Sequence, residues 1–307
     1  MWLGIDTGGT FTDFVLFDGR ELRVHKVLST PHAPEEAILQ GIADLGVDLE
    51  GLQVVHGSTV ATNAVLERKG VRTAYITNRG LGDVLTIGRQ ARRELYNLQP
   101  EPLPPPVPRE LCLEVGARIG ADGGRIGALT DEDKQALLAR LAELRPEAVA
   151  INLLFSFLDD SDERTLAAWL PDNVFVSRSS EVLPEYKEYE RGIATWLNAW
   201  VGPLVDGYLR RLGEGLRPAS VTVMQSAGGT VSAAQAGRRA VRLLLSGPAG
   251  GLMGARFIGR QAGDTRLLTF DMGGTSTDVA LIDGDIQLTS EGRIGPWPVA
   301  VPMVDMH

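Results

Sequence analysis

The sequence contains a single cysteine, Cys112, among 307 residues. One thiol excludes a disulfide within the chain and any zinc or iron–sulfur site built only from cysteines of one chain. Apolar runs are short as well, since none reaches the roughly 18 to 20 residues that span a bilayer. The first residues show no signal-peptide pattern. We therefore expect a cytoplasmic protein outside the membrane, with Cys112 as a small, at least half-buried residue rather than a nucleophile.

Several signatures of known sites are also missing. A G-x-x-x-x-G-K-[ST] phosphate loop and a G-x-G-x-x-G turn after a strand are both absent, which argues against a P-loop NTPase and a dinucleotide-binding fold. With only four histidines and no H-E-x-x-H, a zinc hydrolase is not supported. The absence of G-x-S-x-G removes the usual nucleophile elbow of hydrolases.

Composition sets the remaining bounds. The chain is 44% hydrophobic and 22% charged, as in an ordinary globular protein, and its length favours about two domains. The net charge of −9 argues against a general partner of nucleic acids or of anionic membranes.

One eight-residue pattern, D-x-G-G-T-x-T-D, occurs twice, at 6–13 and at 271–278. Six of the eight positions are identical, which indicates a duplication rather than two unrelated glycine turns. Each copy lies between two short apolar runs, so we expect a strand, a glycine turn and a second strand.

The residue types in this pattern suit a phosphate group. Paired glycines let the backbone approach an anion, while turn amides and threonine hydroxyls can donate to it. An aspartate that ends the first strand suits magnesium, usually through water, which assigns this role to Asp6 and Asp271. The predicted phosphate contacts are Gly8, Gly9, Thr10, Thr12 and Asp13 in the first copy, and Gly273, Gly274, Thr275, Thr277 and Asp278 in the second. Asp13 and Asp278 have a second reading, as caps of the turn amides.

A further glycine segment, 246–251, separates an expected strand at 242–245 from an expected helix at 252–262. The helix N-terminus would face this loop and form an anion site that includes Gly247 and Gly250. The alternative is a plain strand-to-helix turn in which glycine allows close packing.

Two other candidate residues lie in less distinctive surroundings. His56 belongs to an expected strand at 53–58, followed by a helix at about 60–69 whose first amides would lie beside it. Arg191 lies in the longest helical pattern, which starts near Glu185, and we expect a break or kink in it at Gly202-Pro203. Spacing alone favours a surface charge pair with a core tyrosine for the segment 188–191.

Alternating strand and helix patterns run through the rest of the chain. Helices are expected at 34–46, where Pro34 opens the first turn, at 131–144, with a capping box of Thr130 and Asp133, and at 159–170. Strands are expected at 113–119, 148–153, 174–177 and 221–225. We place the domain boundary near 179–184, which gives domains at 1–180 and 181–307.

Taken together, these motifs resemble the hydantoinase A and 5-oxoprolinase family, within the actin, sugar-kinase and heat-shock ATPase superfamily. The resemblance covers essentially the whole chain. It is carried by 6–13, 56–59 with 61–64, 188–191, Thr195 with 198–199, 225–229, 246–251 and 269–278.

The resemblance implies an α/β, duplicated ribonuclease-H-like (actin-like ATPase) fold with two mixed-sheet halves, the second incomplete. It implies an ATP-dependent hydrolase that phosphorylates and opens a cyclic amide such as a hydantoin, 5-oxoproline or a related lactam, with Mg²⁺ or Mn²⁺. Related carboxylase subunits act instead on a ketone or bicarbonate. His56 and Arg191 would then act on the substrate side, and Asp305 with His307 would hold a further divalent metal.

The same resemblance implies a hydantoinase B-like partner subunit or domain, and an oligomer. Family members continue beyond the Asp-x-His at 305–307 into an adenosine-binding segment. We therefore expect either a subunit completed elsewhere or a truncated nucleotide-binding or assembly module without independent catalysis.

Overall fold

A computed structural model of the chain describes residues 1–91, 94–99, 104–272 and 277–306. The chain folds into two compact units. Unit 1 comprises Met1–Lys69, Leu204–Gly295 and Val301–His307, and unit 2 comprises Gly70–Pro203 and Pro296–Ala300. These units follow from contacts in the folded chain. The division into domains at 1–180 and 181–307 was made from the sequence, and it stays a prediction.

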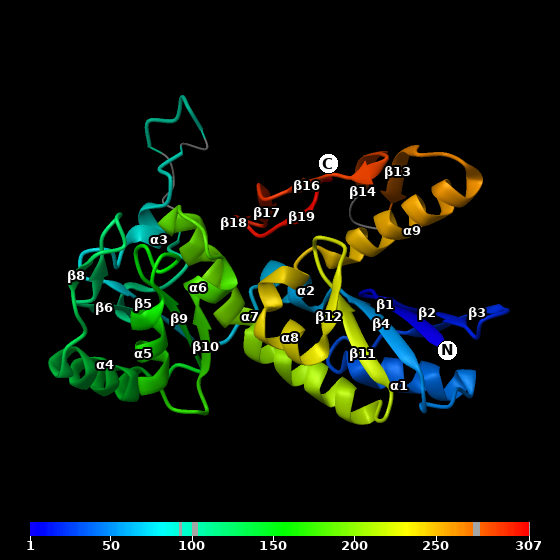
Figure 1. Cartoon of the computed structure of the whole chain (residues 1–307), viewed down its shortest axis with the longest axis horizontal. Helices are drawn as coiled ribbons and strands as arrows, with labels where there is room; N and C mark the ends of the chain where they lie inside the picture. Colours follow the sequence, from blue (N-terminus) through cyan, green and yellow to red (C-terminus); the bar gives the residue numbers. More distant parts are fainter. Residues whose placement is uncertain (92–93, 100–103, 273–276, 307) are drawn as a thin grey trace. The chain divides into compact units, whose positions relative to one another are not determined.

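Unit 1 is built on a six-stranded mixed sheet with the strand order β12-β11-β4-β1-β2-β3 (Figure 1). Strands β1, β4 and β11 run parallel, and the remaining neighbours are antiparallel. This arrangement confirms the expected α/β class with a mixed sheet. The strands are β1 (Trp2–Thr7), β2 (Phe11–Phe17), β3 (Leu22–Leu28), β4 (Gln53–Ser58), β11 (Ser220–Met224) and β12 (Thr230–Ser232).

The helices of unit 1 include α1, which covers one face of this sheet. Pro34 lies in its first turn and Gly46 ends it in the left-handed conformation, as the sequence predicts. A Cβ on Gly41 would lie 2.2 Å from the ring of Phe14 in β2, so only glycine lets α1 approach so closely. The helical segments that contribute to unit 1 are α1 (Pro34–Leu45), α2 (Val60–Leu66), the C-terminal part of α7 (Glu188–Gly215), α8 (Ala233–Arg238), η2 (Ala240–Leu243) and α9 (Ser246–Ala262).

Side-chain alternation decides which residues of β1 and β2 face α1. Leu3, Ile5, Phe14 and Leu16 are buried on that side. Because strand side chains alternate between faces, Asp6 and its neighbours at even positions of β1 point to the opposite face.

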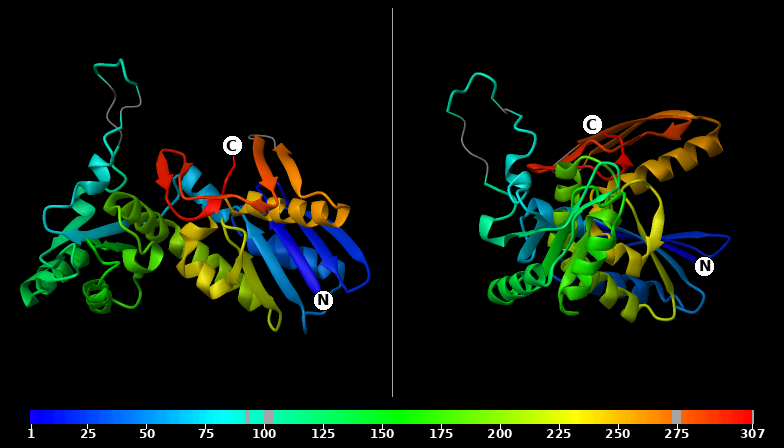
Figure 2. Two further views of the ribbon diagram at one scale, coloured as in Figure 1. Left: turned by 45° about the horizontal axis from the view of Figure 1, so that its top comes forward. Right: turned by 60° about the vertical axis from the view of Figure 1, so that its left-hand side comes forward.

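The second copy of the repeat forms the hairpin of β13 (Arg266–Met272) and β14 (Thr277–Asp283), extended by β15 (Asp285–Ile286). Figure 2 shows this hairpin running along α9. Leu252 of α9 packs with Ala280 and Ile282 of β14 in a small core of its own. The last strands are β16 (Leu288–Thr289), β17 (Gly292–Ile294), β18 (Trp297–Val299) and β19 (Met303–Val304).

Unit 2 contains a four-stranded parallel sheet with the order β10-β9-β5-β6. All five residues of β9 are buried, as expected for a parallel strand covered on both faces. The strands are β5 (Thr73–Asn78), β6 (Cys112–Val115), β9 (Ala148–Asn152) and β10 (Phe175–Arg178), with β7 (Arg118–Ile119) and β8 (Arg125–Gly127) as a separate pair. The helical segments are α3 (Val84–Ile87), η1 (Arg109–Leu111), α4 (Asp131–Leu144), α5 (Ser161–Trp169), α6 (Ser179–Val182) and the start of α7. The capping box of Thr130 and Asp133 is confirmed.

Several predicted boundaries were wrong. The segment 242–245 is no strand, because the Ser226 amide and hydroxyl bond the Arg242 carbonyl and hold this stretch in a turn. The predicted strand 113–119 is split into β6 and β7, and the helix 60–69 ends at Leu66. Helix α7 continues through Pro203 without a break, because buried residues on both sides keep it packed although proline removes one backbone bond. No helix within the described residues is long and apolar enough to cross a membrane.

Candidate functional site

The two copies of the repeated pattern form hairpins in the same register. Asp6 pairs with Asp13 across β1 and β2, and Asp271 pairs with Asp278 across β13 and β14. The six residues between each pair of aspartates place both carboxylates on one face of the hairpin, since directly opposed residues share a face. The expected strand, turn and strand are confirmed for the first copy, and the two expected strands are confirmed for the second. Gly273, Gly274 and Thr275 lie outside the described residues, as does the side chain of Thr277.

The first turn is held from the neighbouring strand. The Gly8 amide donates to the Phe11 carbonyl at 3.0 Å, and Ser29 donates its hydroxyl to the Gly8 carbonyl at 2.8 Å and its amide to the Thr10 carbonyl at 2.9 Å. Within the described part of the chain, the exposed amides of Gly9 and Thr10 have no protein acceptor. The turn thus presents two N–H donors in a fixed backbone.

Other side chains of the first hairpin support the turn. The hydroxyl of Thr12 is buried and lies 3.0 Å from the Ser29 hydroxyl, while Asp13 forms an ion pair with Lys26 at 2.7 Å. The hydroxyl of Thr7 is buried without a hydrogen-bond partner in the described structure. Thr12 therefore supports the turn through Ser29, whereas the sequence suggested that it contacts phosphate directly.

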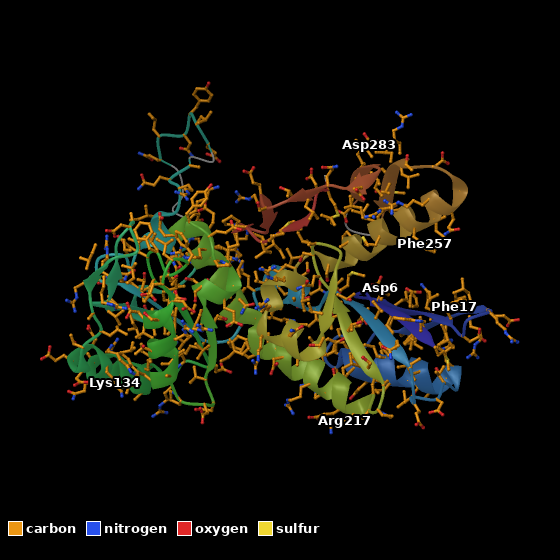
Figure 3. All side chains as sticks on the ribbon, in the orientation of Figure 1. Asp6, Phe17, Lys134, Arg217, Phe257 and Asp283 are labelled. Carbon is orange, nitrogen blue, oxygen red and sulfur yellow. The ribbon has the colours of Figure 1, made fainter. Side chains whose placement is uncertain are left out.

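Asp6 lies at the end of β1, on the open face of the sheet (Figure 3). Its carboxylate extends over Gly57 of β4, where a Cβ would lie 3.2 Å from Oδ1. Partial burial raises the pKa of Asp6, and the negative charges of Asp13 and Asp271 raise it further. The charge of the exposed Asp271 thus reaches Asp6, and both acids belong to unit 1.

The carboxyl ends of β1 and β4 also gather the starts of two helices. The Thr59 hydroxyl donates to the Thr7 carbonyl at 3.0 Å, and the Val60 amide donates to the Ser58 hydroxyl at 3.2 Å. From α9, the Ser246 hydroxyl donates to the Ser58 carbonyl at 3.2 Å. The fold thus brings the 56–59 and 246–251 motifs together, which the sequence did not predict.

The glycine segment 246–251 is the first turn and a half of α9, where a loop was predicted. Leu245 adopts the left-handed conformation and its amide donates to the Thr62 hydroxyl at 2.9 Å, which sets the helix start at Ser246. A Cβ on Gly250 would meet no atom within 4 Å, and one on Gly247 would meet only the methyl of Thr59 at 3.7 Å. Gly247 and Gly250 therefore leave space at the N-terminus of α9, and its free amides remain a candidate anion contact.

His56 lies in the core of unit 1. Its ring is fully buried on β4, and its Nε2 hydrogen-bonds the hydroxyl of Tyr208 in α7. Burial lowers the pKa of His56 to about 4, because a charged imidazole would lose its solvation. The structure thus gives His56 a packing environment, and its predicted action on a substrate stays a prediction.

Arg191 is buried in unit 2. Its Nε donates to Asn152 and Ser179, Nη1 to the Glu185 carbonyl at 2.7 Å, and Nη2 to the Leu153 carbonyl at 2.8 Å. Burial lowers the pKa of Arg191. Spacing favoured a surface charge pair for the segment 188–191, but Arg191 is buried, and its neighbour Glu190 pairs instead with Arg89.

Of the Asp-x-His pair, only Asp305 lies within the described residues. The Asp305 amide donates to the Gln287 carbonyl at 2.9 Å, which fixes the backbone directly after β19, whereas His307 lies outside the described residues. Among described residues, no group of three or more His, Cys, Asp or Glu side chains could hold a metal ion.

Sequence reasoning missed Ser29 and Gly57. Ser29 reaches the turn only through the pairing of β2 with β3, so no local spacing marks it. Gly57 belongs to the motif at 56–59. The signal that could have identified it is that only a small residue fits beside Asp6.

Comparison with known proteins gives consistent matches. The family model of the hydantoinase/oxoprolinase N-terminal region matches residues 2–173, and that of hydantoinase/oxoprolinase matches residues 191–307. Caprolactamase subunit alpha from Pseudomonas jessenii is 32% identical over 99% of this chain and 47% of its own length. 5-Oxoprolinase 1 from Arabidopsis thaliana is 29% identical over 99% of this chain and 27% of its own length.

Solved structures agree. The nucleotide-free structure of acetone carboxylase, from a study of ATP-dependent acetone carboxylation, superimposes with a TM-score of 0.87 at 28% identity, over the whole chain and 47% of that protein. The structure of ATP-dependent caprolactamase from Pseudomonas jessenii gives 0.85 at 31% identity, with the same coverage. The chain thus spans about half the length of these relatives.

Proposed function

The chain belongs to the hydantoinase/oxoprolinase family, and we propose that it is the phosphate-binding part of an ATP-dependent enzyme that opens a cyclic amide. The observation that carries this proposal is the pair of hairpins in equal register, with acids of both copies acting on one region of unit 1. Relatives named as a caprolactamase and a 5-oxoprolinase support the choice of a cyclic amide.

The residues present fit the phosphates of ATP and a divalent cation. The amides of Gly9 and Thr10 have no protein acceptor among the described residues, and the buried Thr7 hydroxyl below them is unpaired. The negative charges of Asp13 and Asp271 raise the pKa of Asp6, and a divalent cation held through water would offset the charge of these acids. We assign Asp6 and Asp271 to magnesium, through water, and Gly8, Gly9 and Thr10 to phosphate oxygens.

The other groups position this region. Gly57 leaves space for the Asp6 carboxylate, and Ser29 and Thr12 fix the turn. The free amide of Gly247 in the first turn of α9 would add a donor beside the Thr59 end of β4, and Gly250 leaves the approach to that turn open. When bound, ATP supplies the phosphoryl group that makes an unreactive amide carbonyl electrophilic.

Replacing Asp271 tests this proposal. Asp271→Ala should lower substrate-dependent ADP release by about 10- to 100-fold, because it removes one group that holds the cation. The melting temperature should stay within about 2 °C, since the side chain is exposed. Calorimetric titration with magnesium-ATP and a coupled ADP assay with hydantoin, 5-oxoproline and simple lactams measure both effects.

Asp283→Ala is the matched control, because Asp283 is an exposed acid at the far end of the same hairpin (Figure 3). It should leave ATP binding unchanged. Equal ADP release by Asp271→Ala and wild type would contradict the assignment. Binding of ATP without turnover on any substrate would favour a nucleotide-binding module without independent catalysis.

A ketone is the second candidate substrate. The similarity to acetone carboxylase, with a TM-score of 0.87, supports it. Product analysis separates the two candidates. Opening a lactam yields an amino acid and opening a hydantoin yields an N-carbamoyl amino acid, whereas carboxylation of a ketone incorporates labelled bicarbonate.

A partner subunit completes the proposal. Relatives are named as subunits, and apolar side chains of β13 and β14 such as Leu268, Phe270 and Leu281 are exposed. We assign the partner to a hydantoinase B-like subunit or domain, with a further divalent metal at Asp305 and His307 as part of the same proposal.

A further inference from the structure

Unit 2 contains a cavity of about 250 Å³ between the loop that follows β9 and the start of α7. This volume corresponds to about eight water molecules at roughly 30 Å³ each. We call it the switch-point cavity. Residues of the phosphate-binding hairpins do not line it.

The cavity lies where parallel sheets bind ligands. From β5 the chain continues to β6, at one edge of the sheet. From β9 it continues to β10, at the opposite edge (Figure 1). Arg89 follows β5 and α3, while Leu154, Phe155 and Phe157 follow β9, and these residues line the cavity. Ligands of open parallel sheets bind outside the carboxyl ends of strands at such a divergence.

Two lining residues hold an unusual backbone conformation. Phe155 has φ of 59° and Lys187 has φ of 70°, although neither is glycine. Such conformations are strained in residues other than glycine and cluster where a site requires them. Here they direct one aromatic and one cationic side chain to the same cavity.

The charges on the wall are of both signs. Arg89 is engaged with Glu190, and three nitrogens of Arg191 already donate within the protein, which leaves one N–H on each Nη. The side chains of Lys187 and Glu188 form no ion pair within the described residues. The Lys187 ammonium lies 5.7 Å from the centroid of the Tyr186 ring.

Apolar surface lies between these charges. Phe155, Phe157 and Tyr186 line the cavity together with Leu154. A carboxylate can pair with Lys187 and the remaining donors of Arg191, an ammonium group can pair with Glu188, and a short hydrocarbon chain can contact the rings.

We infer that the switch-point cavity binds a small amino acid in its zwitterionic form. The choice of an amino acid among zwitterions rests on the proposed function, because hydrolysis of a lactam such as 5-oxoproline leaves an amine and a carboxylate on one molecule, whereas an opened hydantoin keeps its nitrogen in a neutral ureido group. The cavity is then a site for the opened product within unit 2.

Equilibrium binding without ATP tests the inference. Probes are glutamate and unbranched ω-amino acids of about four to seven carbons, with alkyl carboxylates and alkyl amines of equal length as comparisons. Calorimetry or ligand-observed NMR should show the best amino acid binding about tenfold or more tightly than either comparison, since each loses one ion pair. Equal affinities, or no binding at about 10 mM, would overturn it.

Variants locate the binding. Lys187→Asn keeps a residue type that tolerates positive φ but removes the charge, and it should weaken amino acids and carboxylates about tenfold. Lys187→Arg should retain most of the affinity. Glu188→Gln should lower the affinity for the amino acid to that for the carboxylate. Lys134→Asn, on α4 of the same unit (Figure 3), is the control and should bind as wild type does.

The outcomes separate this inference from the proposed function. Asp271→Ala should still bind the amino acid, because the titration contains no ATP. Full ATP turnover together with amino-acid binding that is insensitive to Lys187→Asn would leave the proposed function intact and reject the cavity.

Discussion

The ring of His56 packs against Tyr208 inside unit 1, where charge is costly. The Arg191 guanidinium is buried as well, yet it remains compatible with burial because Asn152, Ser179 and two carbonyls accept its hydrogen bonds. Asp6 differs from both, since it stays accessible to solvent at the end of β1. At the scale of single residues, accessibility therefore separates Asp6, a candidate cation contact, from the buried side chains of His56 and Arg191.

His56 should make stability depend on acid. In the unfolded chain the imidazole binds a proton near its ordinary pKa of 6.5, whereas in the fold its pKa is about 4. Between these values the unfolded state binds more protons, so the free energy of unfolding should fall on acidification, by up to about 3 kcal/mol. The stabilisation is complete above pH 6.5.

Urea unfolding of wild type and His56→Gln across this range measures the effect. The variant should be less stable near neutral pH because it disturbs the Tyr208 contact, but its acid-dependent loss should be smaller. Parallel profiles for the two proteins would show that His56 does not titrate differently on unfolding.

The helix α1 illustrates how an element depends on a single small residue. Its start at Pro34 and its end at Gly46 follow from local rules. Its distance from the sheet depends instead on Gly41, which faces the ring of Phe14. The same element also carries Glu35, which pairs with Arg211 of α7.

A pair of glycine substitutions tests this dependence. Gly41→Ala should lower the free energy of unfolding by about 1–3 kcal/mol, because the added Cβ would overlap Phe14. Gly213→Ala in α7 should raise it by up to about 1 kcal/mol, since its Cβ meets no atom within 4 Å and alanine favours helix. Chemical denaturation measures both, and equal shifts of the same sign would contradict the proposed packing.

The whole molecule consists of two compact units with distinct candidate sites. All groups assigned to phosphate and magnesium lie in unit 1, and every residue that lines the switch-point cavity lies in unit 2. Helix α7 supplies residues to both units.

Hydrogen exchange tests this distribution. Magnesium-ATP should slow exchange at 8–13, 58–62 and the start of α9, where amides would contact or neighbour phosphate. The core strands β5 and β9 should exchange as in the free protein. Protection confined to unit 2 would contradict the assignment of the phosphates to the hairpins.

By itself the sequence determined the features that depend on local spacing. The six residues between each pair of aspartates set equal hairpin registers, and Thr130 with Asp133 begins α4. These predictions were correct because alternation and capping act over a few neighbouring residues.

Only the tertiary structure decided which motif residues are accessible and which segments meet. His56 is buried because α7 packs on β4, α9 begins at Ser246 because Thr62 and Ser58 contact that segment, and the cavity forms where residues after β5 and β9 meet the start of α7. Each outcome depends on contacts between residues far apart in the chain. Burial and such contacts follow from packing of whole elements, which local patterns do not encode.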